Sequence, residues 1–252
     1  MIERFPVYFS PSSDERMVSV YLPEGYAESD EAYPVMYMFD GQNAFEDSAA
    51  SYGKSWRLHT FMDGWHKRMI VVGLQSSPEG DRRLAEYCPY HLAPRSWAGL
   101  RGRGRATMDY LTGTLKPMID SRFRTMPQRT CTGVMGGSMG AIMSLYAVMA
   151  FNDVFSKAIC ISPALSMCYP QLEQELRESS INPDTRVYIS WGEQETRDKK
   201  SLAHLTRQSL TISNLLMRHG ARVYPWLQEN GRHCEEDWSS QTEEAMRFLW
   251  LE

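Results

Sequence analysis

The chain has 252 residues, of which 42% are hydrophobic and 23% are charged, and its formal net charge is −4. This size and composition predict one globular domain over residues 1–252 with a sizeable core. The weakly acidic balance argues against a nucleic acid partner, and the lack of an apolar run of about 18 residues argues against a membrane partner.

Eight short apolar runs predict eight strands. The first two, at 4–9 and 16–22, alternate apolar and polar residues, which predicts an antiparallel opening pair. The later runs are almost continuously apolar, which is typical of strands buried on both faces of a parallel sheet. They span residues 34–39, 69–74, 130–135, 157–162, 186–191 and 221–227.

Helical patterns separate these runs. Residues 107–123 carry apolar side chains at helical spacing, and Pro117 should kink this helix or end it early. Residues 138–151 are apolar on nearly all sides, and 201–220 and 235–250 predict amphipathic helices. The alternation of strands and helices predicts an α/β fold, with a mostly parallel sheet of eight strands and helices on both faces.

The longest stretch without a predicted element runs from about residue 75 to residue 105. A loop of this length in a compact domain is usually functional, so we expect it to contribute to a substrate pocket. Together with Asp40, its candidates for substrate contact are Arg83, Glu86, Tyr87, His91 and Trp97. A purely structural ion pair between Arg83 and Glu86 is the alternative interpretation.

Four glycines surround one serine, Ser138, in the run GVMGGSMGAIM. The central GGSMG matches G-x-S-x-G between a predicted strand and a predicted helix, which is the context of a nucleophile elbow. Such a turn exposes the serine Oγ and requires small residues two positions before and after it. It also directs the next amide, that of Met139, into the site. We therefore predict that Ser138 is a nucleophile, with an ordinary strand-to-helix turn as the alternative.

A serine nucleophile needs an adjacent base, and the base needs a carboxylate. His233 follows the last predicted strand and can return to Ser138 at that edge of the sheet, so we predict that it is the base. For the acid, we predict Glu195 first, Asp198 second and Glu193 third. Asp198 is also suited to cap the helix that follows it. The chain order serine, acid, histidine is the one expected of an α/β-hydrolase.

The turn DGQN after the third predicted strand offers a second oxyanion donor. Gly41 permits a tight turn, and we predict that the amide of Gln42 acts together with that of Met139. A plain turn is the alternative, because Asp, Gly and Asn are common turn residues.

The five cysteines contain no C-x-x-C pair, which indicates a reducing, cytoplasmic setting. The first residues carry charges and lack the apolar stretch of a signal peptide. No His/Cys/Asp cluster has metal-ligand spacing, so we expect neither a metal ion nor a cofactor.

Several segments resemble the Putative esterase family of α/β-hydrolases, which includes enterochelin esterases, feruloyl esterases and S-formylglutathione hydrolases. The most specific are DGQN and GGSMG, and the others include RRLAEYCPY, LKPMIDSRFRT, SPAL, GEQE and GRHCEEDW. The resemblance spans nearly the whole chain. It implies an α/β-hydrolase fold and serine-dependent, metal-free hydrolysis of small-molecule carboxylic or thiol esters. It places Ser138 at the nucleophile, His233 at the histidine and Glu195 at the acid, which is Asp in some relatives.

Three alternatives remain open at this point. An acyltransferase would use the same residues with an alcohol in place of water. A binding module on the same fold would not be an enzyme, and a peptidase would act on a different bond. The sequence also leaves open the acyl and alcohol groups of the substrate and whether the chain forms a homo-oligomer.

Overall fold

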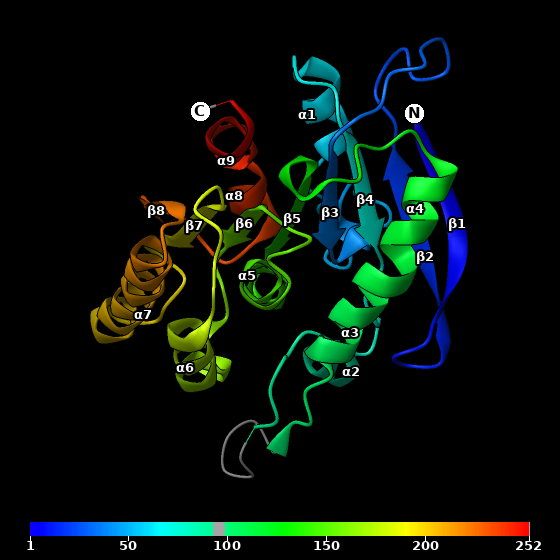
Figure 1. The fold of residues 1–252 in the computed structure, drawn as a ribbon. Coiled ribbons are helices and arrows are strands. Elements are labelled where there is room, and N and C mark those ends of the chain that lie inside the picture. The colour runs from blue at the N-terminus through cyan, green and yellow to red at the C-terminus, as the bar shows by residue number, and fades with distance from the viewer. Residues whose placement is uncertain (93–98, 252) are drawn as a thin grey trace.

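A computed structural model describes residues 1–92 and 99–251 of the chain. Its centre is an eight-stranded sheet in the order β1-β2-β4-β3-β5-β6-β7-β8, with helices on both faces (Figure 1). The strands are β1 (Ile2–Phe9), β2 (Asp14–Tyr21), β3 (Val35–Phe39), β4 (Ile70–Leu74), β5 (Thr132–Gly137), β6 (Lys157–Ile161), β7 (Arg186–Gly192) and β8 (Arg222–Gln228). All eight predicted strands form, and the predicted fold class is confirmed.

The opening strands are the antiparallel part of this sheet. β1 pairs with β2, and β2 pairs with β4, both in antiparallel register. The six strands from β3 to β8 pair with one another in parallel register. Because parallel strands end at the same edge, the segments that follow β3, β5, β6 and β7 converge there.

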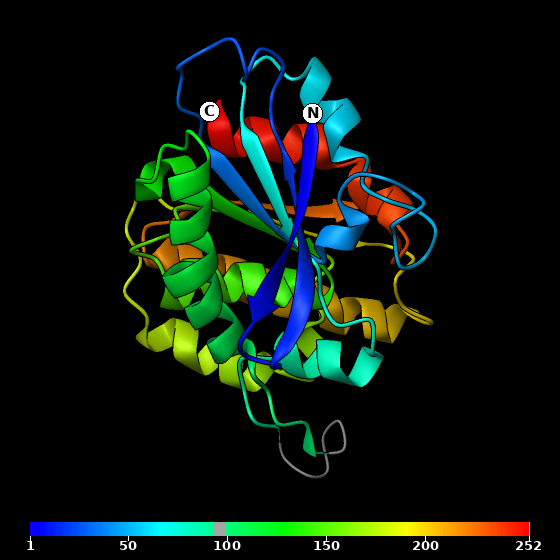
Figure 2. The same ribbon diagram turned by 90° about the vertical axis from the view of Figure 1, so that its right-hand side faces the viewer.

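Two separate apolar cores lie on the two faces of the sheet. Helices α3, α4, α5, α6 and α7 cover one face, and α1, α8 and α9 cover the other, as Figures 1 and 2 show. Their bounds are α1 (Leu58–Gly64), α3 (Gly104–Tyr110), α4 (Lys116–Arg122), α5 (Met139–Ala150), α6 (Tyr169–Glu178), α7 (Lys199–Arg218), α8 (Glu235–Ser239) and α9 (Thr242–Trp250). Every residue of α5 from Met139 to Met149 is buried, as its apolar sequence predicts.

Pro117 does not end its helix. A π-helical turn, η3 (Leu111–Leu115), joins α3 to α4, and the helical run continues to Arg122. The amide of Lys116 donates to the carbonyl of Leu111, five residues back. The π turn lies directly before α4, whose second residue is Pro117, and such single π turns occur inside helical runs. The expected early end of this helix is therefore wrong.

Three other expectations need correction. The stretch from about 75 to 105 is not irregular throughout, because it contains α2 (Gly80–Glu86) and a β-bridge between His91 and Arg101. The last amphipathic helix is two helices, α8 and α9. Strand β8 is not buried on both faces: it lies at the edge of the sheet, and each of its residues is exposed or half-buried.

Within the described residues, no helix combines the length and the apolar character needed to cross a membrane.

Candidate active site

Ser138 occupies a strained turn between β5 and α5. Its backbone has φ 57° and ψ −116°, a conformation that is costly for a residue with a side chain. A Cβ on Gly136 would lie only 2.6 Å from the carbonyl carbon of Gly140, so the turn can close only with glycine at that position. The predicted nucleophile elbow thus has the backbone that its glycines indicate.

His233 reaches Ser138 from the loop between β8 and α8. Its Nε2 lies 3.0 Å from Ser138 Oγ. Its side chain remains 41% exposed, which leaves one side of the imidazole open to a substrate. Ninety-five residues of chain separate the two side chains, and the parallel order of the sheet brings them together.

Glu195 completes a hydrogen-bonded row with these two residues. Its Oε2 lies 3.1 Å from Nδ1 of His233, and its side chain is only 5% exposed. Its Oε1 accepts hydrogen bonds from the Ser162 hydroxyl and the Gly192 amide. These contacts assign Nδ1–H to the side that faces Glu195, which leaves Nε2 free to accept the serine proton.

The other two candidate acids face elsewhere. Glu193 accepts a hydrogen bond from the Asn230 amide at 3.1 Å. Asp198 caps α7, where its side chain accepts from the amide and the hydroxyl of Ser201 at 2.9 and 2.8 Å. These hydrogen bonds lower the pKa of the Asp198 carboxyl. Of the three carboxylates, the structure brings Glu195 to His233.

Two residues that the sequence did not single out support this row. Ser162 follows β6 directly, with φ 52°, and accepts a hydrogen bond from Trp238 Nε1 at 2.9 Å. The Trp238 ring also packs against Gly137, where a Cβ would lie 2.7 Å from the indole. A signal for Ser162 was present, because a polar residue at the carboxyl end of a buried strand faces the same sheet edge as Ser138.

The two backbone amides predicted to bind the oxyanion belong to the turns that follow β5 and β3. Met139 is the first residue of α5, and the first hydrogen bond of that helix runs from Ile142 to Ser138, so the Met139 amide has no partner within the helix. Gln42 lies in the turn η1 (Gly41–Asn43), whose first hydrogen bond is donated by the Asn43 amide. The Gln42 side chain is held by Ser76, whose backbone N–H donates a hydrogen bond to Gln42 Oε1 at 3.2 Å.

Two cavities meet at Ser138 and His233. The first, which we call the α7 cavity, has a volume of about 920 Å³ and extends along η5 (Leu165–Met167) and the first turns of α7. The second, which we call the η1 cavity, has a volume of about 530 Å³ and extends over η1 to Trp56 and Glu235. An ester bound at Ser138 thus has space on both sides of its carbonyl group.

A family model described as Putative esterase matches residues 11–249 of the chain. The chain belongs to this esterase family. As a member it is a hydrolase of carboxylic esters, and the resemblance inferred from its motifs is confirmed.

Three proteins are similar to this esterase in sequence or in fold. It is 24% identical over 209 residues to "Uncharacterized protein YbbA" of Bacillus subtilis (strain 168), a match that covers 81% of this chain and 79% of YbbA. Its fold is similar to that of an IroE-like serine hydrolase from Shewanella oneidensis, with a TM-score of 0.78 at 18% identity over 98% of this chain and 79% of the other. An S-formylglutathione hydrolase from Agrobacterium tumefaciens gives 0.69 at 15% identity, over 99% and 94% of the two chains.

The residues predicted for substrate contact in this esterase are dispersed. Asp40 and Arg83 line the η1 cavity and form a two-pronged ion pair, with Nε–Oδ1 at 2.6 Å and Nη2–Oδ2 at 2.7 Å. Tyr87 is buried, and its hydroxyl accepts a hydrogen bond from the backbone amide of Asp40 at 2.8 Å. His91 is exposed and forms the bridge to Arg101. Trp97 lies outside the described residues.

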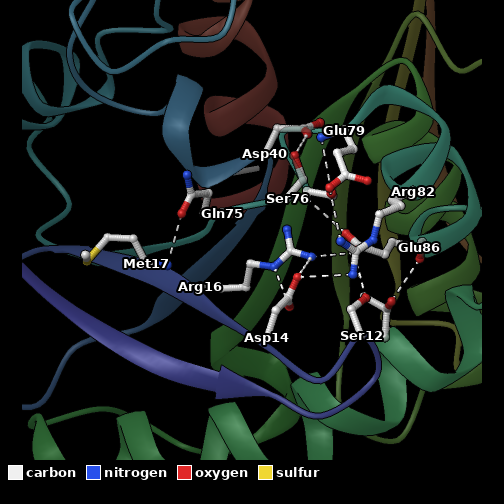
Figure 3. A network of polar contacts seen from close by, with 12 residues as sticks. Ser12, Asp14, Arg16, Met17, Asp40, Gln75, Ser76, Glu79, Arg82 and Glu86 are labelled. Atoms are coloured by element: carbon white, nitrogen blue, oxygen red, sulfur yellow. Dashed lines mark hydrogen bonds and ion pairs between the residues drawn. The ribbon is translucent and has the colours of Figure 1, made fainter.

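Glu86 lines neither of the two cavities at Ser138. It is 2% exposed. Its carboxylate accepts hydrogen bonds from Arg16 Nη2 at 2.6 Å and from the Ser12 hydroxyl at 2.8 Å (Figure 3). The alternative of an ion pair between Arg83 and Glu86 is therefore wrong, because each of these residues pairs with a different partner. The reason is geometric: Arg83 faces the turn after β3, whereas Glu86 faces the antiparallel opening strands.

No group of three or more histidine, cysteine, aspartate and glutamate side chains in residues 1–92 and 99–251 is arranged to hold a metal ion.

Proposed function

We propose that this member of the family is a serine esterase that acts on small-molecule carboxylic or thiol esters through Ser138, His233 and Glu195. The observation that carries the proposal is the unbroken row of contacts from Ser138 Oγ to His233 Nε2 at 3.0 Å and from His233 Nδ1 to Glu195 Oε2 at 3.1 Å. A serine hydroxyl becomes nucleophilic when an oriented imidazole can take its proton.

In the acylation half, Ser138 Oγ attacks the ester carbonyl carbon while its proton moves to His233 Nε2. The buried Glu195 carboxylate accepts Nδ1–H, keeps the imidazole in this tautomer and stabilises the positive charge that develops on it. The amides of Met139 and Gln42 stabilise the negative charge on the carbonyl oxygen. His233 then donates its proton to the leaving oxygen or sulfur, and an acyl-enzyme remains on Ser138.

In the deacylation half, water takes the place of the departed alcohol or thiol. His233 Nε2 accepts a proton from this water, and the resulting hydroxide attacks the acyl carbonyl. Collapse of the second tetrahedral intermediate returns the proton to Ser138 Oγ and releases the acid. Each step uses protons and electron pairs that the substrate, water and the three side chains supply.

Covalent labelling tests this function. A fluorophosphonate should label the protein once, and Ser138→Ala should abolish both the label and ester hydrolysis while the circular dichroism spectrum is retained. Ser166 lines the α7 cavity without contacting His233, so Ser166→Ala is the matched control and should retain the label. Labelling that survives in Ser138→Ala would remove the serine from its proposed role.

A further inference from the structure

The η1 cavity contains a carboxylate that the proposed mechanism does not use. Glu235 is the first residue of α8, two positions after His233, and its side chain lines this cavity together with Ser138 and His233. The residue is only 6% exposed. Acidic residues are rarely buried to this extent without an ion-pair partner, so its place beside the nucleophile requires an explanation.

The nearest cation of the η1 cavity is already engaged. Arg83 directs its guanidinium to both carboxylate oxygens of Asp40, and this pair balances its own charge. Among the described residues, Glu235 forms no ion pair. Its side chain receives a hydrogen bond from Asn43 Nδ2 at 3.3 Å, a long and uncharged contact. The cavity therefore holds one carboxylate whose charge the protein does not neutralise.

The surroundings of Glu235 disfavour that charge. Burial raises the pKa of its carboxyl. A hydrogen bond from its own backbone amide lowers the pKa, the neighbouring Asp40 raises it, and His233 and Arg83 lower it. Such an environment gains free energy when a positive group enters the cavity and pairs with the carboxylate, because a charge-assisted hydrogen bond is strong where water is excluded.

A role limited to the start of α8 does not explain this burial. The first turn of α8 also carries Glu236 and Asp237, which pair with Arg232 at 3.4 and 2.9 Å. Glu236 is exposed, so an acidic side chain in this turn can be solvated. Glu235 is the member of the three that is buried and lines the cavity at Ser138.

We propose that Glu235 binds a protonated amine carried by the ester substrate in the η1 cavity, so that amine-bearing esters are the preferred substrate class. The proposal rests on the proposed serine esterase function. The amine belongs either to the acyl part or to the alcohol part, since both Ser138 and His233 open onto this cavity.

Pairs of esters with matched shapes test the proposal and separate the two sources of the amine. For the acyl part, ethyl 3-aminopropanoate is compared with ethyl butanoate. For the alcohol part, 2-(dimethylamino)ethyl acetate is compared with 3-methylbutyl acetate. The wild-type protein should show a kcat/KM about tenfold or more higher for the amine member of one pair, because hydrogen bonds to charged groups are the stronger class.

Glu235→Gln should bring that ratio close to one, because the amide keeps the shape but loses the charge. Glu236→Gln, the matched control, should retain the wild-type ratio. The proposal is overturned if the wild type prefers the amine in neither pair, or if the preference survives in Glu235→Gln. Where the variant folds poorly, the wild-type comparison still overturns the proposal if the amine is preferred in neither pair.

Failure of this inference is distinguishable from failure of the serine esterase function. A protein that is labelled by fluorophosphonate and hydrolyses neutral esters without an amine preference refutes only the role of Glu235. A protein that is neither labelled nor hydrolytic on any of the four esters refutes both.

Discussion

The indole of Trp238 stands edge-on to the imidazole of His233, with ring centroids 4.9 Å apart and an interplanar angle of 86°. The same indole donates its Nε1–H to Ser162, which donates to Glu195. Trp238 thus contacts the proposed base directly and the proposed acid through one hydroxyl. An aromatic ring in this position restricts the imidazole to the orientation that serves Ser138.

Trp238→Phe should lower kcat by about tenfold and leave KM nearly unchanged. Phenylalanine retains an aromatic ring toward His233 but cannot donate to Ser162, and one lost hydrogen bond of about 1.4 kcal/mol corresponds to a tenfold change in rate. Steady-state kinetics on a 4-nitrophenyl ester measure the change. Trp226→Phe, in the edge strand β8, is the control and should leave kcat unchanged. An effect on KM alone would place Trp238 in substrate binding.

Glu195→Gln should lower kcat by roughly 10³-fold or more, because the amide no longer stabilises the protonated imidazole. Folding should be retained, since the side chain keeps its shape. Asp198→Ala should leave kcat near the wild-type value and lower the thermal midpoint slightly, because its contacts are those of the α7 cap. The opposite result, with a nearly normal Glu195→Gln and an inactive Asp198→Ala, would move the acid to Asp198.

Glu235→Gln should change how stability depends on pH. Because burial raises the pKa of this carboxyl in the folded protein above its ordinary value of 4.5, the folded state binds the proton more tightly than the unfolded chain does. The stability that Glu235 contributes is greatest at low pH and is lost as the pH rises through the folded-state pKa. The variant should therefore unfold at a higher temperature than the wild type at about pH 7.

At about pH 4 the same variant should show no gain, because both the folded and the unfolded wild type are then largely protonated at this carboxyl. Thermal midpoints measured across this range, with Glu236→Gln as the exposed control, give the comparison. A gain that is equal at both pH values would mean that packing, and not the charge of Glu235, determines the difference.

Glu86→Gln should destabilise the fold by about 1–3 kcal/mol, because the buried Arg16 guanidinium loses its closest carboxylate while it keeps Asp14 at 2.9 Å. The two side chains are 3% and 2% exposed and lie 2.6 Å apart. Urea unfolding measures the loss. Glu79→Ala, which removes an exposed partner of Arg82, should cost less than about 0.5 kcal/mol. The folded fraction of Glu86→Gln should retain its kcat, and a large loss of kcat would return Glu86 to the site.

Gly41→Ala should lower both stability and kcat. A Cβ at this position would lie 2.2 Å from the carbonyl carbon of Gly73, so the turn that holds the Gln42 amide must move away from β4. We expect a loss of about 1–3 kcal/mol in urea unfolding and a matching fall in turnover. Gly64→Ala, at a position with open space around it, is the control. A fully active Gly41→Ala would argue against the Gln42 amide as an oxyanion donor.

Most of the sheet could be predicted because its strands carry strong local patterns. The runs that became β3 to β7 are apolar on both faces. Such strands must be buried on both faces of a sheet, whatever their order in it. Strand β8 has a similar composition but lies at the edge, and composition alone does not reveal how many neighbours a strand has. Pro117 misled because the helical run continues past it to Arg122, after a π turn that ends two residues earlier and that the sequence pattern does not reveal.

In the candidate site, too, some features follow from a local sequence pattern and others depend on residues that are distant in the chain. The glycines around Ser138 indicate its strained turn directly, because only their missing side chains permit it. The partners of Arg83 and Glu86 could not be predicted, because the two residues lie one turn apart on α2 and face different elements. Their partners, Asp40 and Arg16, are distant in the chain, so no local sequence pattern indicates these ion pairs.

The position of Ser138 and His233 on the border of two cavities bears on how products leave. In the proposed mechanism the alcohol departs into one cavity while the acyl group still fills the other. The vacated volume, about 530 Å³ even on the smaller side, admits far more than a water molecule. A second alcohol added in excess should therefore react with the acyl-enzyme. The ratio of new ester to free acid then measures how well the vacated cavity binds that alcohol in competition with water.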